Sequence, residues 1–448
     1  MSRKIPAMLL MLCMTLSVAA CGTQAPPASQ ATPVSEASST ATASTEAGAS
    51  AEPSPAAEPF SISVADWMIG TGNPNSQAYM DAVTKGYAAI YPQATIEWNP
   101  IQGEQYHELL KAQLASGNAP DLFAFQNAIV PFGKAGYLTD LSDQPWTKDI
   151  LDSTRVDITY EGKILAAPVD VAGWGIFYNK KVFADLGVTP PKTFDEFLAI
   201  CDKANERKIV PLTGGYREWQ AAAPPYGLQS FLYGANPHVA ADLYDGKTQI
   251  NGPEFTALFN ALEIMYKRGA YARDILSTTY EQAQQLIGEG KAAMIIDGPW
   301  ICPAVADRYK TDLGFFVMPD AQGNVTMTTS VNSEFGLNAQ SKLQSKGLAL
   351  LNVLVSKETV PLLLKNSSFS GMKGYSVEQL TTGAREYNDA LSQYPAGPQF
   401  SSWLPPSTYD KFTQICTKTI SGQPFDPKDL EDIDTTYLKD KGLINVLK

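Results

Sequence analysis

The stretch FSISVADWMIGTGNPNSQAYMDAVTKGYAAIYPQATIEWNPIQGEQYHELLKAQLASGNAPDLFAF, residues 60–125, decides the fold class. Its start, Phe60-Ser-Ile-Ser-Val, alternates apolar and polar side chains, which predicts a strand that ends at Trp67 before a Gly- and Asn-rich turn. The remainder predicts, in order, a helix at 77–91, a strand at 94–98, a helix at 104–116 and a strand at 121–125. This β-α-β-α-β order favours a parallel sheet flanked by helices.

Helix signals of the same kind return later in the chain. Thr193-x-x-Glu196 and Thr278-x-x-Glu281 are spaced like capping boxes, and Pro253 suits the first turn of a helix. An apolar run at 292–296 predicts a buried strand, and further helices are expected at 345–364 and 409–420. About 390 residues of this pattern exceed a single core, so we expect two α/β lobes with a ligand cleft between them.

The N-terminus reads as an export signal. Arg3 and Lys4 precede a short apolar run, and Val-Ala-Ala-Cys closes the segment at Cys21. This ending looks like a bacterial lipobox, so we expect residues 1–20 to be removed and Cys21 to be acylated and to anchor the protein to a membrane. An ordinary signal cleaved near Ala20 would instead leave a free thiol. Residues 21–59 are rich in Ala, Ser, Thr and Pro, which predicts a flexible tether behind the anchor.

Composition excludes several functional classes. The 448 residues carry a formal net charge of −12, which argues against nucleic-acid binding. Two histidines and five cysteines without a CxxC pair argue against a zinc site, and the glycine-rich stretches lack the spacing of a nucleotide-binding loop. We therefore expect no metal and no cofactor.

Catalytic constellations are weak but not all excluded. There is no G-x-S-x-G motif, and His107 lies on a polar helix face where a solvated histidine is expected. Cys201 lies on an apolar helix face, and an exported protein could form one disulfide among its three downstream cysteines. Glycoside hydrolysis needs only two carboxylates, and Asp121, Asp170 and Asp297 are all predicted at strand ends.

Tryptophans in glycine- or proline-rich turns are the distinctive signal. Flat indole faces at strand ends can stack on the C–H faces of a sugar while nearby polar side chains bind its hydroxyls. Three of the five such tryptophans are expected in one site, and the others in packing; the five are Trp67, Trp174, Trp219, Trp300 and Trp403.

Several motifs resemble, in order, the extracellular solute-binding proteins of ATP-binding-cassette importers, in the carbohydrate-binding family that includes maltose-binding proteins. The most specific are Ser116-Gly-Asn-Ala-Pro-Asp-Leu-Phe123, Tyr178-Asn-Lys-Lys-Val-Phe183, Pro190-Pro-Lys-Thr-Phe-Asp-Glu-Phe197 and Gly290-Lys-Ala-Ala-Met294 with Gly298-Pro-Trp300. The ordered set runs through residues 60–335, and the chain after 340 fits by pattern only.

The resemblance implies a two-lobed α/β fold, closure on a ligand by a hinge, no catalysis, and delivery of the ligand to a membrane permease. It places the first lobe at 60–169 plus 336–375 and the second at 170–335 plus 376–448. It assigns ligand contacts to Trp67, Gln126, Asp170, Trp219 and Trp300, and less firmly to Asn332, Glu334, Tyr375 and Trp403. Trp174 joins the expected ligand contacts from its glycine-flanked position alone. We expect a monomer that binds an oligosaccharide. A polyamine, a phosphorylated polyol or a surface glycoside hydrolase remain alternatives.

Overall fold

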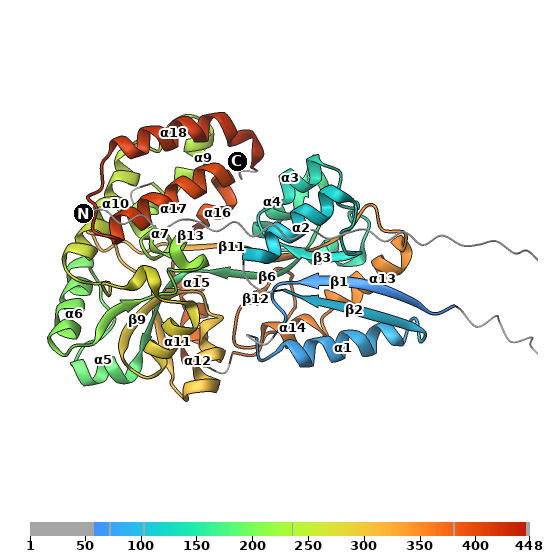
Figure 1. Ribbon diagram of the computed structural model, residues 1–448, viewed down its shortest axis with the longest axis horizontal. Coiled ribbons are helices and arrows are strands. Elements are labelled where there is room, and N and C mark those ends of the chain that lie inside the picture. The colour runs from blue at the N-terminus through green and yellow to red at the C-terminus, as the bar shows by residue number, and fades with distance from the viewer. Residues whose placement is uncertain (1–57, 71–72, 102–103, 235, 380, 445–448) are drawn as a thin grey trace, which may run out of the picture. The chain divides into compact units, whose positions relative to one another are not determined.

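The computed structural model describes residues 58–70, 73–101, 104–234, 236–379 and 381–444. The expected signal segment, Cys21 and nearly all of the tether lie outside these residues. Two β-sheets, each flanked by its own helices, organise the chain that is described (Figure 1). Hydrophobic clusters pack against each of them. The expected two-lobed α/β fold is therefore confirmed.

The first sheet has the strand order β12-β6-β11-β3-β1-β2, with β13 beside β11. Its strands are β1 (Phe60–Asp66), β2 (Ala94–Pro100), β3 (Leu122–Phe125), β6 (Ala167–Gly173), β11 (Met327–Leu337), β12 (Phe369–Ser370) and β13 (Ala396–Pro398). The strand β1 pairs in parallel with both β2 and β3, which confirms the predicted β-α-β-α-β opening. The intervening helices are α1 (Ser76–Ala88) and α2 (Glu104–Ser116), close to the predicted ranges.

The strands β6, β11 and β12 bring together three distant parts of the chain. Thr329–Phe335 in β11 pairs antiparallel with β6, while β12 pairs with the other edge of β6. The pairing of β6 with β11 shifts register around Ser333, where Asp170 is its partner. Asp170 thus lies in the middle of a strand and not at a strand end, which corrects the sequence prediction.

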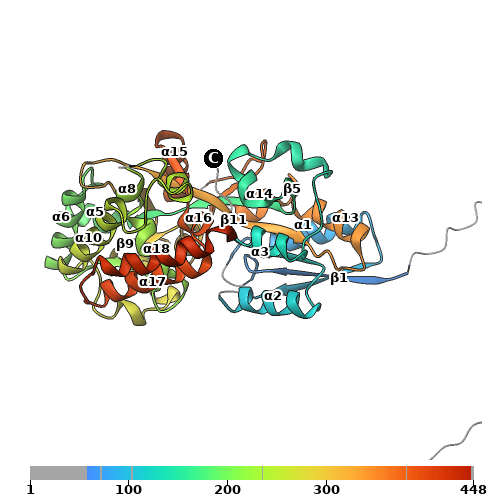
Figure 2. The same cartoon turned by 90° about the horizontal axis from the view of Figure 1, so that it is seen from above.

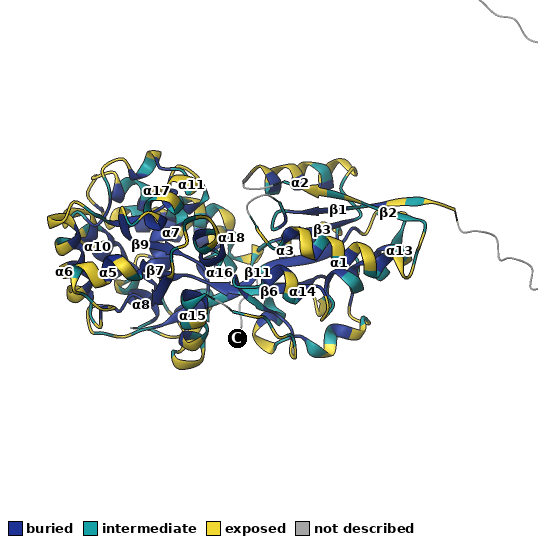
Figure 3. Ribbon diagram, turned by 90° about the horizontal axis from the view of Figure 1, so that it is seen from below, coloured by how far each residue is buried: buried dark blue, intermediate teal, exposed yellow. Residues whose placement is uncertain are grey.

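The second sheet has the strand order β10-β7-β9-β8 and hydrophobic side chains on both faces. Its strands are β7 (Gly175–Asn179), β8 (Val210–Thr213), β9 (Ala292–Asp297) and β10 (Leu313–Phe316). In β7, Ile176 and Tyr178 belong to one hydrophobic cluster and Phe177 to another, as strand periodicity requires. Figure 3 shows β7 and β9 buried, whereas α1, α2 and α13 carry exposed residues.

Helices cover both faces of this second sheet. One face packs against a group that includes α6 (Phe194–Glu206), α7 (Ala223–Gly227), α8 (Gln229–Tyr233), α10 (Pro253–Lys267), α17 (Pro406–Ile420) and α18 (Lys428–Asp440). The opposite face packs against α11 (Tyr280–Gly288), α12 (Ile301–Tyr309) and α15 (Thr382–Gln393). Figure 2 shows α17 and α18 side by side, in agreement with their contacts.

Short elements complete the described chain. The remaining helices are α3 (Ile129–Lys134), α4 (Arg155–Ile158), α5 (Lys180–Leu186), α9 (Val239–Tyr244), α13 (Gln344–Leu354), α14 (Val360–Leu364) and α16 (Phe400–Trp403). A two-stranded ribbon joins β4 (Thr159–Tyr160) to β5 (Lys163–Ile164). Among the residues with a described conformation, none of the helices has the length and apolar character needed to cross a membrane.

The hydrophobic clusters follow the two sheets. One cluster takes its buried residues from between 62 and 169, from Phe335 and Leu337, and from between 350 and 372. The other two take theirs from between 174 and 327 and from beyond 383. Because hydrophobic clusters do not locate hinge points, the lobe boundaries at 169/170, 335/336 and 375/376 stay predictions.

Three helix predictions need correction. The single helix expected at 345–364 is two helices, α13 and α14, because a polar turn separates them and Pro361, in the first turn of α14, has no amide hydrogen to continue the hydrogen bonds of α13. The capping box before α11 lies one residue later than predicted, with Thr279 and Gln282 as its partners. At α6, Thr193 caps the helix, but the Glu196 carboxylate accepts from the Lys192 amide, so only half of the predicted box forms.

Candidate functional site

Three of the predicted tryptophans meet beside the second sheet. The ring centroids of Trp174 and Trp300 are 5.4 Å apart at 87°, and those of Trp174 and Trp219 are 5.6 Å apart at 62°. Trp219 and Trp300 are themselves 6.3 Å apart. Edge-to-face contacts of this kind are favoured between aromatic rings because the positive edge of one meets the negative face of the other. We call Trp174, Trp219 and Trp300 the indole group.

Each indole is positioned at the end of a strand. Trp174 occupies the single residue between β6 and β7, and its carbonyl accepts from the buried Gln229 amide at 3.1 Å. Trp219 begins the short 3-10 helix η3 (Trp219–Ala222) that follows β8. Trp300 follows β9 and precedes α12. Adjacent strand ends therefore bring residues far apart in sequence to one place.

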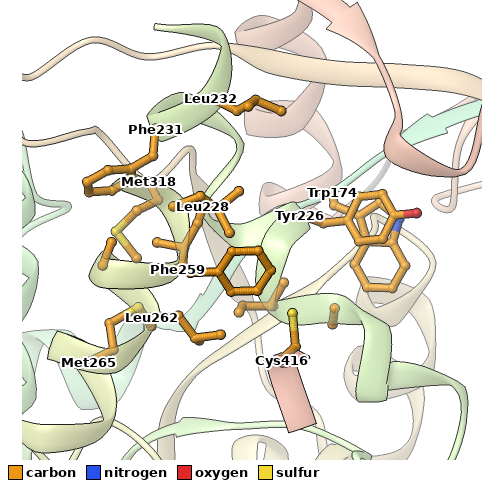
Figure 4. Packing of buried hydrophobic residues seen from close by; sticks show 14 of the residues in the cluster. Trp174, Tyr226, Leu228, Phe231, Leu232, Phe259, Leu262, Met265, Met318 and Cys416 are labelled. Carbon is orange, nitrogen blue, oxygen red and sulfur yellow. The ribbon is translucent and has the colours of Figure 1, made fainter. Parts of the chain in front are cut away.

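The three indoles differ in exposure. Trp174 is 9 % exposed, because Tyr226 stacks on it at 4.9 Å with an interplanar angle of 17°. Figure 4 shows these two rings lying face to face at the edge of the hydrophobic cluster. Trp219 and Trp300 are only partly buried. Trp174 thus packs behind the other two indoles, and Trp219 and Trp300 are the rings that a ligand could contact.

A glycine and a carboxyl group fix Trp300. A Cβ on Gly298 would lie 2.1 Å from the Trp300 ring, so this ring lies directly against the Gly298 backbone. The Asp297 carboxylate accepts from the Gly298 amide and from the Tyr280 hydroxyl, both at 2.9 Å. Burial raises the pKa of Asp297 to about 7, although these hydrogen bonds oppose the shift. Tyr280 also packs against Trp219, with 5.0 Å between ring centroids.

A chain of hydrogen bonds links three strands of the first sheet. The Gln126 Nε2 donates to Asn332 Oδ1 at 2.9 Å, and Asn332 Nδ2 donates to Asp170 Oδ2 at 3.0 Å. Ser368 Oγ donates to the same Asp170 oxygen at 3.2 Å. We call Gln126, Asn332, Asp170 and Ser368 the polar relay. It joins three residues predicted from the resemblance to one, Ser368, that was not predicted.

Buried carboxyl groups surround the polar relay. Asp66, Asp170 and Glu334 are each at most 1 % exposed, and burial raises the pKa of Asp66, of Asp157 and of Asp170 to about 7. Burial, with Asp157 and Asp170 as neighbours, raises the pKa of Glu334 well above its usual value. Neither Glu334 carboxyl oxygen has a hydrogen-bond partner among the described residues. Groups that lose water without a charged partner are favoured in the neutral form.

Trp67 lies apart from the indole group, next to a histidine. Its ring is 6.0 Å from that of His107, and its Nε1 is buried without a hydrogen-bond partner in the described chain. His107 is partly buried, and burial with Lys111 nearby lowers its pKa to about 4. The prediction of a solvated surface histidine is therefore wrong, because α2 turns this ring toward Trp67.

The weaker site predictions fall in different environments. Trp403 is 1 % exposed and packs against Phe400 and Phe255 in the core of the second lobe. Tyr375 is partly buried, and its hydroxyl donates to the Val355 carbonyl at 2.7 Å. Neither belongs to the indole group or to the polar relay.

The carboxylates considered for hydrolysis lie in separate networks. Asp121 precedes β3 and accepts from the Ser63 amide and hydroxyl and from the Ser341 hydroxyl, which ties β1 to the loops before β3 and after β11. Asp297 supports Trp300, and Asp170 belongs to the polar relay. Cys201, Cys302 and Cys416 are buried free thiols, as expected for Cys201. No cluster of three or more metal-ligating side chains occurs among the residues whose positions are described.

Sequence reasoning missed the residues that support the site. Tyr226 and Tyr280 touch the indoles. Tyr226 stands between Pro224-Pro225 and Gly227, so the proline and glycine signal that was applied to tryptophans could have found it had tyrosines been included. Asp66, which directly precedes Trp67, was also missed. Its position as a polar residue at the end of a buried strand could have marked it as a candidate site residue. Ser368 had no signal, because its role depends on pairing between β12 and β6.

Comparison with known proteins places the chain in a family. Residues 71–361 match the family model described as bacterial extracellular solute-binding protein. A probable sugar-binding periplasmic protein of Mesorhizobium japonicum is 24 % identical over 357 residues, covering 72 % of this chain and 80 % of the relative. The melibiose/raffinose/stachyose-binding protein MelE of Bacillus subtilis is 29 % identical over 209 residues, covering 44 % of this chain and 47 % of the relative.

A solved structure shares the fold. A chitin oligosaccharide binding protein aligns with a TM-score of 0.75 at 21 % identity, covering 85 % of this chain and 99 % of that one. At this level of identity the likeness concerns the fold alone. The family match spans more than half of the sequence and agrees with the motifs and with the two-sheet architecture. The chain belongs to the bacterial extracellular solute-binding proteins, the family that its ordered motifs resemble.

Proposed function

We propose that this protein captures a carbohydrate, most simply an oligosaccharide, between its two lobes and delivers it to an ABC-type permease without altering it. The observation that carries the proposal is the indole group, in which two partly exposed rings are held by a third. Indoles suit the apolar faces of sugar rings, and the polar relay supplies amide groups suited to hydroxyls. The names of the relatives, which refer to sugars, support the same ligand class.

The two groups are close enough to serve one ligand. Asp170 and Trp174 are four residues apart, so their Cα atoms are at most ~14 Å from each other. A ligand of several sugar units could contact both the indoles and Gln126. The oligosaccharide-binding relatives support a ligand of more than one sugar unit.

A polyamine is the strongest non-sugar alternative, because acidic side chains gather near the polar relay. Asp66, Asp170 and Glu334 are, however, closed to solvent, and their raised pKa values favour the neutral form. A phosphorylated ligand would need convergent cations, and Arg217 is the cation that follows the Gly214-Gly215 turn. These observations favour a neutral polyol.

A thermal-shift screen tests the ligand class. The protein is heated with mono- and oligosaccharides, polyamines and sugar phosphates, and a ligand at 100 times its Kd should add ~2.7 kcal/mol to the free energy of unfolding. That gain corresponds to a few degrees in Tm for a protein of this size. A shift with a polyamine or phosphate alone would overturn the sugar assignment. Product analysis after incubation with the bound sugar would expose a hydrolase.

Membrane attachment needs its own experiment. We propose that Cys21 carries the lipid anchor and that the segment after it acts as a tether. Cells expressing Cys21→Ser should release the protein from the membrane fraction, whereas Cys302→Ser, which alters a buried thiol, should leave it there. Retention of the Cys21→Ser protein on membranes would contradict lipid anchoring. A single sedimenting species of ~50 kDa would agree with the proposed monomer.

A further inference from the structure

Asp170 was expected to contact the ligand, but the structure closes it off from solvent. It is 1 % exposed in the middle of β6, between β11 on one side and β12 on the other. Its Oδ2 accepts hydrogen bonds from Asn332 and from Ser368. Its carboxylate therefore binds side chains from both neighbouring segments and has no free path to a ligand.

The hydrogen bonds of Asp170 fix the orientation of Asn332. The Asp170 Oδ2 accepts from Asn332 Nδ2, so the Asn332 amide presents its Oδ1 in the other direction. That Oδ1 accepts from Gln126 Nε2 at 2.9 Å. Gln126 in turn must direct its amino group to Asn332, which turns its own Oε1 away from the relay. Gln126 directly follows β3 and is only partly buried, so its side chain, unlike that of Asp170, is not closed off from solvent.

We propose that Asp170 is a positioning residue which, through Asn332, holds Gln126 with its Oε1 ready to accept a hydrogen bond from a ligand hydroxyl. This inference rests on the proposed function and deepens it, because it specifies a ligand that donates a hydrogen bond at Gln126. An amide free to rotate would present its amino group half of the time and would lose rotamer entropy on binding. The relay removes both costs before the ligand arrives.

A carboxylate suits this role better than an amide. The side-chain amide introduced by Asp170→Asn could turn either its oxygen or its nitrogen toward Asn332, whereas a carboxylate offers oxygens only. The second oxygen of Asp170, Oδ1, has no hydrogen-bond partner among the described residues, so a proton there leaves Oδ2 free to accept. Asp170→Asn can keep an acceptor oxygen in place, whereas Asp170→Leu cannot.

A double-mutant cycle tests the relay on the full chain. Calorimetry gives the Kd of the best compound from the thermal-shift screen for wild type, Asp170→Leu, Gln126→Ala and the double variant. We expect each single variant to weaken binding about tenfold and the double variant to be within twofold of Gln126→Ala, because Asp170 acts through Gln126. Asp170→Asn should recover to within about threefold of wild type. Independent effects that multiply to about a hundredfold, or an unchanged Kd in Asp170→Leu, would overturn the proposal.

Asp157→Leu is the matched control. Asp157, in α4, is a partly buried residue whose carboxyl group accepts from the amide of Val331, the residue before Asn332 in β11, but it is not part of the relay. Its loss should lower Tm about as much as Asp170→Leu while leaving Kd within twofold. If Asp157→Leu weakens binding as much as Asp170→Leu does, the effect is general destabilisation and the positioning role fails.

A ligand-free measurement separates this inference from the proposed function. In protein labelled with ¹⁵N-glutamine, the Gln126 side-chain amide signals are identified by their loss in Gln126→Ala. Their chemical shifts should differ from those of a free glutamine amide in wild type and in Asp170→Asn. In Asp170→Leu the shifts should approach the free-amide values. Unchanged signals in Asp170→Leu would contradict the relay. If no carbohydrate binds at all, the proposed function fails, but these spectra still decide whether Asp170 orients Gln126.

Discussion

The indole group and the polar relay hold their side chains in place by different physical means. In the indole group, rings touch rings, and a hydrophobic cluster lies behind Trp174. In the polar relay, single hydrogen bonds join side chains from β3, β6, β11 and the segment before β12. The first arrangement tolerates small shifts because dispersion and hydrophobic contacts vary smoothly, whereas the second depends on donor and acceptor geometry. The indole group should therefore supply most of the affinity, and the relay most of the selectivity.

Removal of an exposed indole should have the largest effect. Trp300→Ala is expected to weaken carbohydrate binding by ~2–4 kcal/mol, on the scale of aromatic hot spots, because it removes both a stacking face and the contact with Trp174. Titration calorimetry measures the loss. Trp98→Ala is the matched control, since Trp98 packs partly buried against the first-lobe cluster and should change Tm but not Kd. Unchanged affinity in Trp300→Ala would remove Trp300 from the site.

A substitution at Gly298 should disturb the Trp300 ring less than its removal does. Gly298→Ala places a methyl group where the Trp300 ring now lies, so the ring must move. We expect about a tenfold loss of affinity, equivalent to ~1.4 kcal/mol. Gly442→Ala, where an added Cβ meets nothing within 4 Å, should bind like wild type. Equal Kd values for the two variants would show that the position of Trp300 does not matter.

Trp219 should respond mildly to a conservative change. Phenylalanine keeps an aromatic face next to Tyr280 but covers less area, so Trp219→Phe should weaken binding only about threefold, and Trp219→Ala by more. The ordering of Kd across the three proteins is the measurement. If both variants weaken binding equally, the area of the aromatic face at residue 219 does not determine affinity, which contradicts stacking at this position.

The carboxyl groups near the relay give the smallest effect, on stability as a function of pH. The pKa values of Asp66, Asp157 and Asp170 are raised to about 7, so the folded state holds protons that the unfolded state releases. Their stabilising contribution is full below the unfolded pKa near 4 and is lost as pH rises through about 7. The free energy of unfolding by urea should therefore fall from pH 4.5 to 7.5.

Two variants, one in each region, sharpen this comparison. Asp157→Asn cannot titrate but keeps an oxygen to accept from the Val331 amide, so the slope of stability against pH should become shallower. Asp297→Asn provides the equivalent change in the indole region, because Asp297 lies beside the rings and burial raises its pKa to about 7. A slope that stays the same in both variants would show that these groups are ionised in the folded protein.

The sequence predicted the indole group better than the polar relay for a physical reason. Each indole lies beside glycines or prolines at a strand end, so local sequence predicts both the turn and the exposed ring. The relay joins residues 162, 198 and 206 positions apart, and no local pattern reports such hydrogen bonds. The resemblance supplied Gln126, Asp170 and Asn332 as separate contacts, but it could not supply their connection or Ser368.

The errors within the fold have local causes. The helix predicted at 345–364 ignored a signal that the sequence does carry, because Ser356-Lys357-Glu358-Thr359 is a polar run and Pro361 has no amide hydrogen to donate within a helix. Adjacent threonines at 278 and 279 offered two capping registers, and the partner at the third following residue could be Glu281 or Gln282. Only the packing of α11 against its neighbours chooses between them.

The three buried thiols make the protein a convenient starting point for an optical sugar sensor. Cys201, Cys302 and Cys416 are at most 2 % exposed, and burial raises the pKa of each thiol, so few thiolates form at the pH of labelling. In a chain from which residues 1–21 have been removed, and with them Cys13 and Cys21, a new cysteine on an exposed helix should be the reactive one. An environment-sensitive dye attached there would report lobe movement without first removing the native cysteines from the folded body.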